Sequence, residues 1–253
     1  MSSGAPAVTL ITGGGSGIGR ATALRLAARG DRVALVDIDA GALAETARAI
    51  RRAGGAAETY CLDVRDRPAI ERLSAAVAQQ LGGITYLFSN AGNAHPGPLS
   101  AMTLAEWNAV IETHVTGAFH LCQAVLPHMV ARKKGAVVLT ASDYAVVGLR
   151  NGANYAAAKT ALYSLTKCLA LEFSPHGIRV NAVGPGPIDT PFLRAGRSGA
   201  KWDEAERRYR GRVPLGRLGR PEEVAAVVDF LLSDRAAYIT GQLLQPNGGQ
   251  VMW

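Results

Sequence analysis

Tyrosine and lysine stand four residues apart twice in the segment NYAAAKTALYSLTKC, first as Tyr155 with Lys159 and again as Tyr163 with Lys167. In a helix, residues four apart share a face, so each pair would place an ammonium beside a phenol. A phenol whose pKa is lowered by a cation can exchange a proton with an alcohol or a ketone. The second pair is rotated by about 80° from the first, because each helical residue turns the chain by about 100°. Both pairs therefore cannot serve one site.

The residues inside each pair favour the first one. Three alanines separate Tyr155 from Lys159, so a flat ligand can approach the helix, whereas the Ser-Leu-Thr inside the second pair is typical of packing. A predicted strand ends at Ser142, and ligands of parallel sheets bind beyond the carboxyl ends of the strands. The predicted catalytic roles are acid/base for Tyr155, electrostatic modifier for Lys159, and hydrogen-bond donor to the substrate oxygen for Ser142.

Oxidation of a secondary alcohol near neutral pH requires the pKa of Tyr155 to fall by about three units from about 10, which amounts to about 4 kcal/mol. An ammonium about 4 Å away supplies roughly that much at an effective dielectric constant of about 20. The positive charge of an oxidised nicotinamide would add to it. This arithmetic predicts that Lys159 lowers the pKa of the Tyr155 phenol.

A glycine-rich turn, TGGGSGIG, follows the first predicted strand and opens a helix expected over 18–29. Because Gly13, Gly17 and Gly19 lack a β-carbon, the backbone can turn sharply there and approach a diphosphate. The free N–H groups at the start of the helix would bind the negative charge. The order of strand, glycine-rich turn and helix predicts a dinucleotide site.

Asp37 closes the second predicted strand, where a carboxylate can accept hydrogen bonds from an adenosine ribose. Ser16, inside the turn, adds no positive charge for a 2′-phosphate. A carboxylate about 4 Å from a phosphate is repelled by up to about 4 kcal/mol per unit charge at a dielectric constant of about 20, and solvent reduces this severalfold. The predicted cofactor is therefore NAD rather than NADP. The alternative is that Asp37 only caps the following helix.

Short apolar runs alternate with helical segments, which predicts an α/β fold with a doubly wound parallel sheet and helices on both faces. The predicted strands cover residues 7–12, 32–37, 57–63, 84–90, 136–142 and 178–183. Helices are expected to begin at the capping box of Thr103 and at Pro221, and to span 153–173.

A single domain is expected over residues 1–253, because no repeat or linker divides the chain. Its expected parts are a dinucleotide-binding core with the catalytic residues over 7–184, a substrate flap over 185–213, and a C-terminal helix, strand and interface tail over 214–253. The flap is rich in glycine, proline and arginine, which predicts an irregular and mobile segment.

The sequence resembles the short-chain dehydrogenase/reductase family over nearly its whole length. The ordered matches are TGGGSGIG, Asp37, Asp63-Val64, NAG over 90–92, Ser142, YAAAK, PGPIDT over 185–190, and a terminal GG over 248–249. The resemblance implies a single-domain Rossmann fold with a seven-stranded parallel sheet, in a homotetramer. It implies that Asp63 and Val64 flank the adenine, that Asn90 lies along the cofactor, and that Ile188 and Thr190 hold the nicotinamide end. Together with the glycine-rich turn, the expected cofactor contacts are Gly13, Ser16, Gly17, Ile18, Gly19, Asp37, Asp63, Val64, Asn90, Gly92, Tyr155, Lys159, Pro185, Ile188 and Thr190.

Two positions depart from the family pattern. His114 stands where the family usually has an asparagine that helps to hold a water between the lysine and solvent. Its imidazole could join a proton relay and add its own titration, or it could be a buried histidine of the core. Asn247 stands where an aspartate is common, which bears on subunit packing rather than on the cofactor.

The composition limits the class of protein. The net charge of +7 comes mainly from the arginines of residues 194–220, which carry no nucleic-acid recognition motif, so no nucleic-acid partner is expected. That basic run is either a solvated face or a site for an anionic substrate or acidic partner. Three widely spaced cysteines predict no metal site and a reducing cytoplasmic location, and the absence of a long apolar run predicts no membrane segment.

The predicted function is an NAD-dependent oxidoreductase that interconverts a small-molecule secondary alcohol and a ketone. One alternative is a 3-oxoacyl-carrier-protein-type ketoreductase that uses NADPH, and another is a catalytically silent NAD(H)-binding regulatory protein. The substrate itself is not predicted. Residues expected to line its pocket are His95, Asp143, Tyr144, Arg150, Asn151, Phe192 and Arg194.

Overall fold

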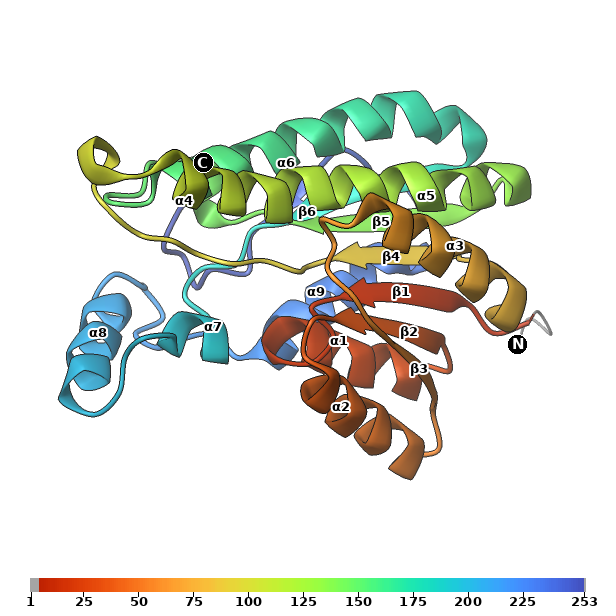
Figure 1. Ribbon diagram of the computed structural model, residues 1–253, viewed down its shortest axis with the longest axis horizontal. Helices are drawn as coiled ribbons and strands as arrows, with labels where there is room; N and C mark the ends of the chain where they lie inside the picture. The colour runs from red at the N-terminus through yellow and green to blue at the C-terminus, as the bar shows by residue number, and fades with distance from the viewer. Residues whose placement is uncertain (1–4, 253) are drawn as a thin grey trace.

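A parallel sheet forms the centre of the computed structural model, which describes residues 5–252 (Figure 1). Within these residues the sheet has seven strands in the order β3-β2-β1-β4-β5-β6-β7, paired in parallel throughout. The strands are β1 (Val8–Thr12), β2 (Arg32–Asp37), β3 (Ala56–Cys61), β4 (Tyr86–Ser89), β5 (Gly135–Thr140), β6 (Ile178–Val183) and β7 (Leu243–Leu244). The predicted fold class is confirmed. Residues 1–4 and 253, the ends of the expected domain and tail, lie outside the described part.

Helices cover both faces of the sheet, with α1, α2 and α9 on one face and α3, α5 and α6 on the other (Figure 1). The helices are α1 (Gly17–Ala28), α2 (Ala40–Arg52), α3 (Arg67–Leu81), α4 (Leu104–Ile111), α5 (Gly117–Arg132), α6 (Ala153–Phe173), α7 (Pro191–Arg194), α8 (Ala200–Arg210) and α9 (Pro221–Leu232). None of those within residues 5–252 is both long and apolar enough to cross a membrane.

The strands are buried on both faces because each face meets a layer of helices. In β2, Val33 and Leu35 pack in the cluster that contains α1, α2 and α9, whereas Ala34 and Val36 pack in the cluster that contains α3 and α5. All four side chains have no exposed surface. This alternation explains why the strand reads as a continuous apolar run in the sequence.

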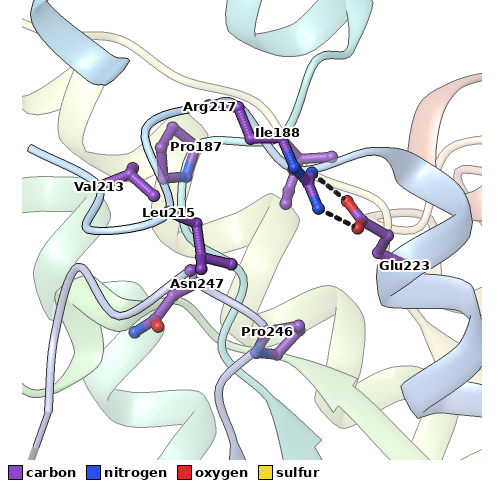
Figure 2. Close-up of a pocket in the computed structure, with 10 residues that line it drawn as sticks. Pro187, Ile188, Val213, Leu215, Arg217, Glu223, Pro246 and Asn247 are labelled. Carbon is purple, nitrogen blue, oxygen red and sulfur yellow. Dashed lines mark hydrogen bonds and ion pairs between the residues drawn. The ribbon is translucent and has the colours of Figure 1, made fainter. Parts of the chain in front are cut away.

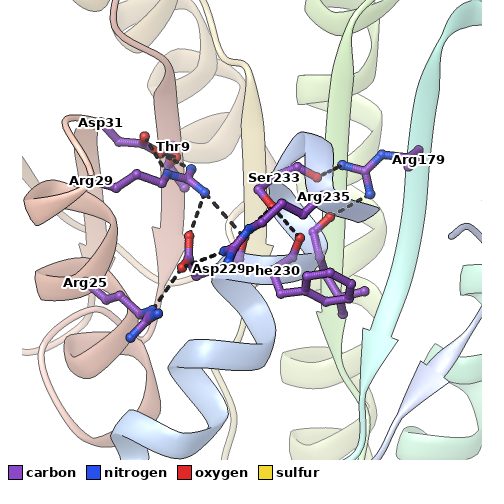
Figure 3. Close-up of polar contacts among 10 residues, drawn as sticks. Thr9, Arg25, Arg29, Asp31, Arg179, Asp229, Phe230, Ser233 and Arg235 are labelled. Atoms are coloured by element: carbon purple, nitrogen blue, oxygen red, sulfur yellow. Dashed lines mark hydrogen bonds and ion pairs between the residues drawn. The ribbon is translucent and has the colours of Figure 1, made fainter. Parts of the chain in front are cut away.

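The order of the strands reverses at β1, which lies between β2 and β4, and ligands of such sheets bind beyond the carboxyl ends of the strands at this point. Helix α1 begins beyond the carboxyl end of β1, and an ionic cluster fixes it to α9 (Figure 3). Asp229 of α9 accepts hydrogen bonds from Arg25 Nε at 3.0 Å, Arg29 Nη1 at 2.8 Å and Arg235 Nη2 at 3.3 Å. Arg29 also binds Asp31 at 2.6 Å, so the cluster also ties α1 to the start of β2.

Two predicted strand ends are wrong by two residues. The predicted strands over 57–63 and 136–142 end at Cys61 and Thr140. Ser142 therefore lies beyond β5, where it caps the short 3₁₀ helix η3 (Asp143–Ala145) by accepting the Tyr144 N–H at 3.2 Å. Serine competes for local backbone groups in this way, which favours a turn over a strand.

The segment over 185–213 was expected to be irregular and is instead partly helical, with α7 and α8. Trp202 and Ala205 of α8 are buried. The three arginines of α8, Arg207, Arg208 and Arg210, are exposed, so its polar side faces solvent. Both helices lie beyond the carboxyl ends of the strands (Figure 1), so the position fits a flap, whose mobility stays a prediction.

Candidate active site

The glycine-rich turn between β1 and α1 leaves no room for a side chain at its key glycines. Gly13 has φ +67° and Gly17 has φ +50°, conformations that favour glycine. A β-carbon on Gly19 would lie 2.0 Å from the carbonyl oxygen of Gly13, so only glycine fits there. Ser16, the N-cap residue of α1, makes no side-chain cap bond, and no acid occupies the first turn. The start of α1 therefore fits a diphosphate.

Asp37 lies against this turn at the end of β2. Its Oδ2 accepts the backbone N–H of Gly15 at 3.0 Å, and its Oδ1 accepts that of Asp39 at 3.2 Å. The following helix is capped by Asp39, whose carboxylate accepts the Ala42 N–H at 3.0 Å. Capping of α2 therefore does not explain Asp37, and its carboxylate stands beside the turn that would hold the diphosphate, where it can reach an adenosine ribose.

Asn90 joins the ends of three strands. It follows β4, and its backbone N–H donates to Thr12 Oγ1 at 2.9 Å at the end of β1. Its side-chain oxygen accepts from Thr140 Oγ1 of β5 at 3.3 Å. Its amide nitrogen would lie 2.8 Å from a β-carbon on Gly13. The side chain thus packs directly against the glycine-rich turn.

The segment after β6 closes the other side of the turn. Thr190 Oγ1 donates to the carbonyl oxygen of Ile188 at 3.2 Å and caps α7 by accepting the Leu193 N–H at 3.2 Å. A β-carbon on Gly17 would meet the Thr190 methyl at 3.2 Å. The segments expected to hold the diphosphate and the nicotinamide end of a dinucleotide therefore lie against each other.

The remaining predicted cofactor residues differ in burial and in their contacts. Asp63 binds Arg65 through Nη2 at 2.6 Å, which keeps the pKa of its carboxyl below the usual value. Val64 is buried, and a β-carbon on Gly117 would lie 2.8 Å from its methyl. Ile18 is half-buried in the first turn of α1, and the Pro185 carbonyl oxygen accepts the Asp143 N–H at 3.4 Å.

Ser142, Tyr155 and Lys159 come together beyond the carboxyl end of β5. Ser142 is 4% and Lys159 is 3% exposed, and Tyr155 is half-buried. A hydrogen bond joins the Tyr155 phenol to Ser142. Lys159 Nζ lies 5.4 Å from the centroid of the Tyr155 ring and donates to the carbonyl oxygen of Thr140 at 2.6 Å. The structure thus groups the three residues that the sequence singled out.

The electrostatics of this group differ from the expectation. Burial raises the pKa of Tyr155 above its usual value, and the hydrogen bond with Ser142 offsets this only in part. Burial also lowers the pKa of Lys159 to about 7. The loss of water around both groups opposes the attraction between the ammonium and the phenolate, from which a lowered pKa of Tyr155 was predicted. In the chain alone, desolvation dominates.

His114 is buried next to this group, in a π-helical turn (Glu112–Thr116) between α4 and α5. Its ring packs edge-on against Tyr155, with the centroids 5.6 Å apart. Its Nε2 lies 2.8 Å from the Asn93 carbonyl oxygen. Burial, together with a smaller effect of the nearby Lys159 charge, lowers its pKa to about 3. The imidazole is therefore neutral near pH 7, so the titration considered from the sequence is not expected.

His114 also contacts the strand-end segment that the sequence assigned to the cofactor. A β-carbon on Gly92 would lie 2.4 Å from His114 Cε1, so a side chain at this position would displace the imidazole. Single-turn π-helices occur often at functional sites because the extra residue redirects a side chain.

Three residues that the sequence analysis did not assign to catalysis belong to the same group. Asn154 has no exposed surface, accepts the Tyr155 N–H at 2.8 Å and donates to the His95 carbonyl oxygen at 3.1 Å. Asn93 lies within hydrogen-bond distance of the imidazole of His114. Asp143 is 1% exposed and accepts the Ser142 hydroxyl at 3.0 Å. In the sequence, the one signal for each of these residues is a polar side chain next to a motif residue.

The flap contributes side chains near Tyr155. Phe192 of α7 lies with its ring centroid 6.3 Å from that of Tyr155. Arg194 forms two hydrogen bonds with Asp189, at 2.7 and 2.9 Å, and lies over the Trp202 ring. The guanidinium of Arg194 is thus already paired with an acid.

A small cavity of about 170 Å³ lies behind the nicotinamide-end segment (Figure 2). Ile188, Val213 and Asn247 line it, together with the Arg217–Glu223 ion pair at 2.6 Å. Its lining does not include Ser142, Tyr155 or Lys159. The cavity therefore marks where the C-terminal tail and the flap pack behind Ile188, not where the group around Tyr155 lies.

Comparison with known proteins shows which family has this arrangement. The family model described as enoyl-(acyl carrier protein) reductase matches residues 13–250. The 3-oxoacyl-[acyl-carrier-protein] reductase FabG of Thermotoga maritima is 38% identical over 245 residues, which cover 97% of this chain and 98% of that protein. The chain belongs to the short-chain dehydrogenase/reductase family. The resemblance stated from the motifs is confirmed.

The names of other members of the family refer to different substrates. The cis-4-hydroxycyclohexanecarboxylate dehydrogenase of Sinomonas cyclohexanicum is 40% identical over 243 residues, covering 96% of this chain and 95% of that protein. The crystal structure of levodione reductase has a TM-score of 0.93 at 37% identity, covering 97% of this chain and 98% of that one. That of NAD⁺-bound xylitol dehydrogenase has a TM-score of 0.91 at 35% identity, covering 98% and 100%. The chain is thus an oxidoreductase of alcohol or keto groups that uses NAD or NADP.

Proposed function

We propose that this short-chain dehydrogenase/reductase interconverts a small-molecule secondary alcohol and a ketone with NAD as its cofactor. One observation carries the proposal: Ser142, Tyr155 and Lys159 meet at the carboxyl end of β5, beside a turn that only glycines can form. A phenol, a hydroxyl and an amine in contact can move one proton and hold one oxygen.

In the oxidising direction, the substrate hydroxyl gives its proton to the oxygen of Tyr155, and the carbinol C–H bond breaks with loss of a hydride. A bound oxidised nicotinamide would supply the acceptor for this hydride, and the products would be a ketone, a reduced nicotinamide and one proton. Lys159 stabilises the phenolate, and Ser142 donates a hydrogen bond to the substrate oxygen. Because burial raises the pKa of Tyr155 in the chain alone, the charges of protonated Lys159 and of the cofactor must both oppose that effect.

The preference for NAD rests on Asp37. Its carboxylate lies 3.0 Å from the Gly15 nitrogen, where it can accept hydrogen bonds from a ribose and would repel a 2′-phosphate. We expect kcat/KM for NAD to exceed that for NADP by at least about tenfold, because even a repulsion of about 1.4 kcal/mol has this effect. The Asp37→Ala variant should narrow the gap. Equal kcat/KM for the two cofactors in the parent enzyme would refute the preference.

A ketoreductase of oxoacyl groups on a carrier protein, using NADPH, is the second candidate. It is supported by the names of relatives such as FabG and by exposed arginines such as Arg207, Arg208 and Arg212 on the flap. Asp37 weighs against it. Faster reduction of an oxoacyl thioester with NADPH than of any free ketone with NADH would favour this candidate.

A catalytically silent NAD(H)-binding regulator is the remaining alternative, and the presence of Tyr155 and Lys159 weighs against it. The decisive variant is Tyr155→Phe, with Tyr163→Phe as the matched control. We expect Tyr155→Phe to bind NADH normally and to lose at least about a hundredfold in kcat, as removal of an acid/base group does. Normal turnover by Tyr155→Phe would end the assignment.

The substrate can be narrowed with a panel of cyclic alcohols, polyols, hydroxy acids and 3-oxo esters, followed by NADH absorbance. The panel covers the chemistry in the names of the relatives, such as a hydroxycyclohexanecarboxylate and xylitol. We further propose a cytoplasmic homotetramer with the C-terminal tail in its interface, and no nucleic-acid partner. Light scattering of the purified protein tests the assembly, and a monomer would refute it.

A further inference from the structure

Asp143, the residue after Ser142, is buried, with 1% of its surface exposed. Its Oδ1 accepts the Ser142 hydroxyl at 3.0 Å. Its Oδ2 is buried and has no hydrogen-bond partner among residues 5–252. A buried ionised carboxylate with one oxygen unpartnered is costly. A residue that only caps a turn does not require a buried carboxylate with an unpartnered oxygen.

Ser142 has a single hydroxyl hydrogen, and the contacts around it show where that hydrogen lies. Its Oγ accepts the Tyr144 N–H at 3.2 Å and is hydrogen-bonded to the Tyr155 phenol. With its hydrogen directed to Asp143, the hydroxyl donates one hydrogen bond and accepts two, which is its full capacity. A substrate oxygen that carries developing negative charge needs that hydrogen for itself. Asp143 and the substrate therefore compete for it.

The outcome of this competition depends on the protonation of Asp143. Burial raises the pKa of this carboxyl to about 6. When protonated, it can donate to Ser142 Oγ in the place that the Tyr155 phenol leaves on turning to the substrate, so the serine hydrogen turns toward the substrate oxygen. When ionised, it accepts that hydrogen. The other titratable groups at this point are Tyr144 on the same turn and Tyr155 on α6. Tyr209 and Arg212 of the flap interact with Tyr144 instead.

We propose that Asp143 is a positioning residue that directs the hydroxyl hydrogen of Ser142, toward itself when ionised and toward the substrate oxygen when neutral. The proposal deepens the proposed function, because it rests on Ser142 as the donor to the substrate oxygen. Oxidation and reduction share one transition state, so the effect on kcat/KM is the same in both directions at a given pH.

The hydrogen bond can be tested without a substrate by ¹³C NMR of the labelled aspartate carboxyls. Loss of one signal in Asp143→Asn identifies the residue. We expect it to titrate near pH 6 in the parent, and at higher pH in Ser142→Ala, because the variant removes the hydrogen bond that favours the carboxylate. Titration near the ordinary value for aspartate, or no change in Ser142→Ala, would overturn the proposal.

The effect on catalysis is tested with Asp143→Asn, whose amide has the shape of the neutral carboxyl. With the panel compound of highest turnover, we expect kcat/KM of the variant relative to the parent to be near one at pH 5. The ratio should rise to about tenfold at pH 7 and toward a hundredfold at pH 8, because the neutral fraction of the parent falls tenfold per unit. The exposed control Asp234→Asn should give a ratio near one throughout.

The same comparison in the Ser142→Ala background separates positioning from a general charge effect, since Asp143 also raises the pKa of Tyr155 through space. If Asp143 acts through Ser142, the ratio at pH 8 falls at least tenfold in that background. Equal ratios in the two backgrounds, or a flat ratio with Ser142 present, would overturn the inference. Turnover retained in Tyr155→Phe would instead refute the proposed function, so the two failures are distinguishable.

Discussion

Helix α6 carries the pattern Tyr-x-x-x-Lys twice, and the surroundings of the two copies differ. Lys159 is 3% exposed and donates to the Thr140 carbonyl oxygen at the end of β5. Lys167 is exposed, and its Nζ lies 3.9 Å from the Tyr163 ring centroid. Tyr163 packs against a small cluster that contains Ala141 and Ala182. Only the first pair stands where a strand end, a hydroxyl and the glycine-rich turn meet, which shows that position in the fold gives the pattern its chemistry.

The largest expected difference between the two pairs is in activity. Lys159→Met should lower kcat by about a thousandfold, because it removes roughly 4 kcal/mol of attraction to the phenolate in the transition state. Lys167→Met should stay within about twofold, since an exposed cation over a ring contributes little. Steady-state rates of the two variants test this, with circular dichroism as the check on folding. Similar losses in both variants would remove the distinction.

The second prediction concerns stability and pH in the cofactor-free protein. The pKa of Lys159 is about 7 when folded, below its value of about 10.4 when unfolded. The unfolded chain therefore binds more protons between these values, and the free energy of unfolding rises with pH by up to about 1.4 kcal/mol per unit. Urea unfolding from pH 7 to 9 should show this slope in Lys167→Met but not in Lys159→Met. The same slope in both variants would contradict the burial of the amine.

A smaller effect is expected from the residue that anchors the first pair. Asn154 accepts the Tyr155 N–H and donates to the His95 carbonyl oxygen without any exposed surface. Asn154→Ala should lower the free energy of unfolding by about 1–3 kcal/mol, since it leaves buried groups unpaired. The exposed Ser164→Ala, near the second pair, should change it by less than about 0.5 kcal/mol. Thermal or urea unfolding measures both, and equal effects would count against an anchoring role.

The smallest effect is expected from His114, whose ring packs against Tyr155. Because its pKa is about 3, the imidazole is neutral across the range in which the enzyme would be assayed. The pH dependence of kcat/KM for His114→Asn should therefore overlay that of the parent between about pH 5 and 8. An ionisation lost in the variant would show that the imidazole titrates during catalysis.

The elements that position the site were predictable where local signals agree. The strand over 178–183, the helix over 153–173 and the capping box at Thr103 occur as expected, because periodicity and caps are local properties. The end of β5 was placed two residues too late, and the helix α8 was missed. The end of β5 depends on the turn at Ser142, which accepts the Tyr144 N–H, and on the Asp143 N–H, which donates to the distant Pro185. Helix α8 is marked by the burial of Trp202 and Ala205, which the composition of the segment does not reveal.

The sequence alone was sufficient to predict a doubly wound α/β fold, a dinucleotide turn and a phenol paired with an amine, because these depend on residue types at fixed spacings. It could not establish the protonation properties of the pair. The pKa of Tyr155 is raised, that of Lys159 is lowered, and Asp143 joins the group as a buried acid with its pKa raised. These properties follow from how much water the packed chain removes from each group, and that quantity exists only once β5, α6 and the flap are assembled.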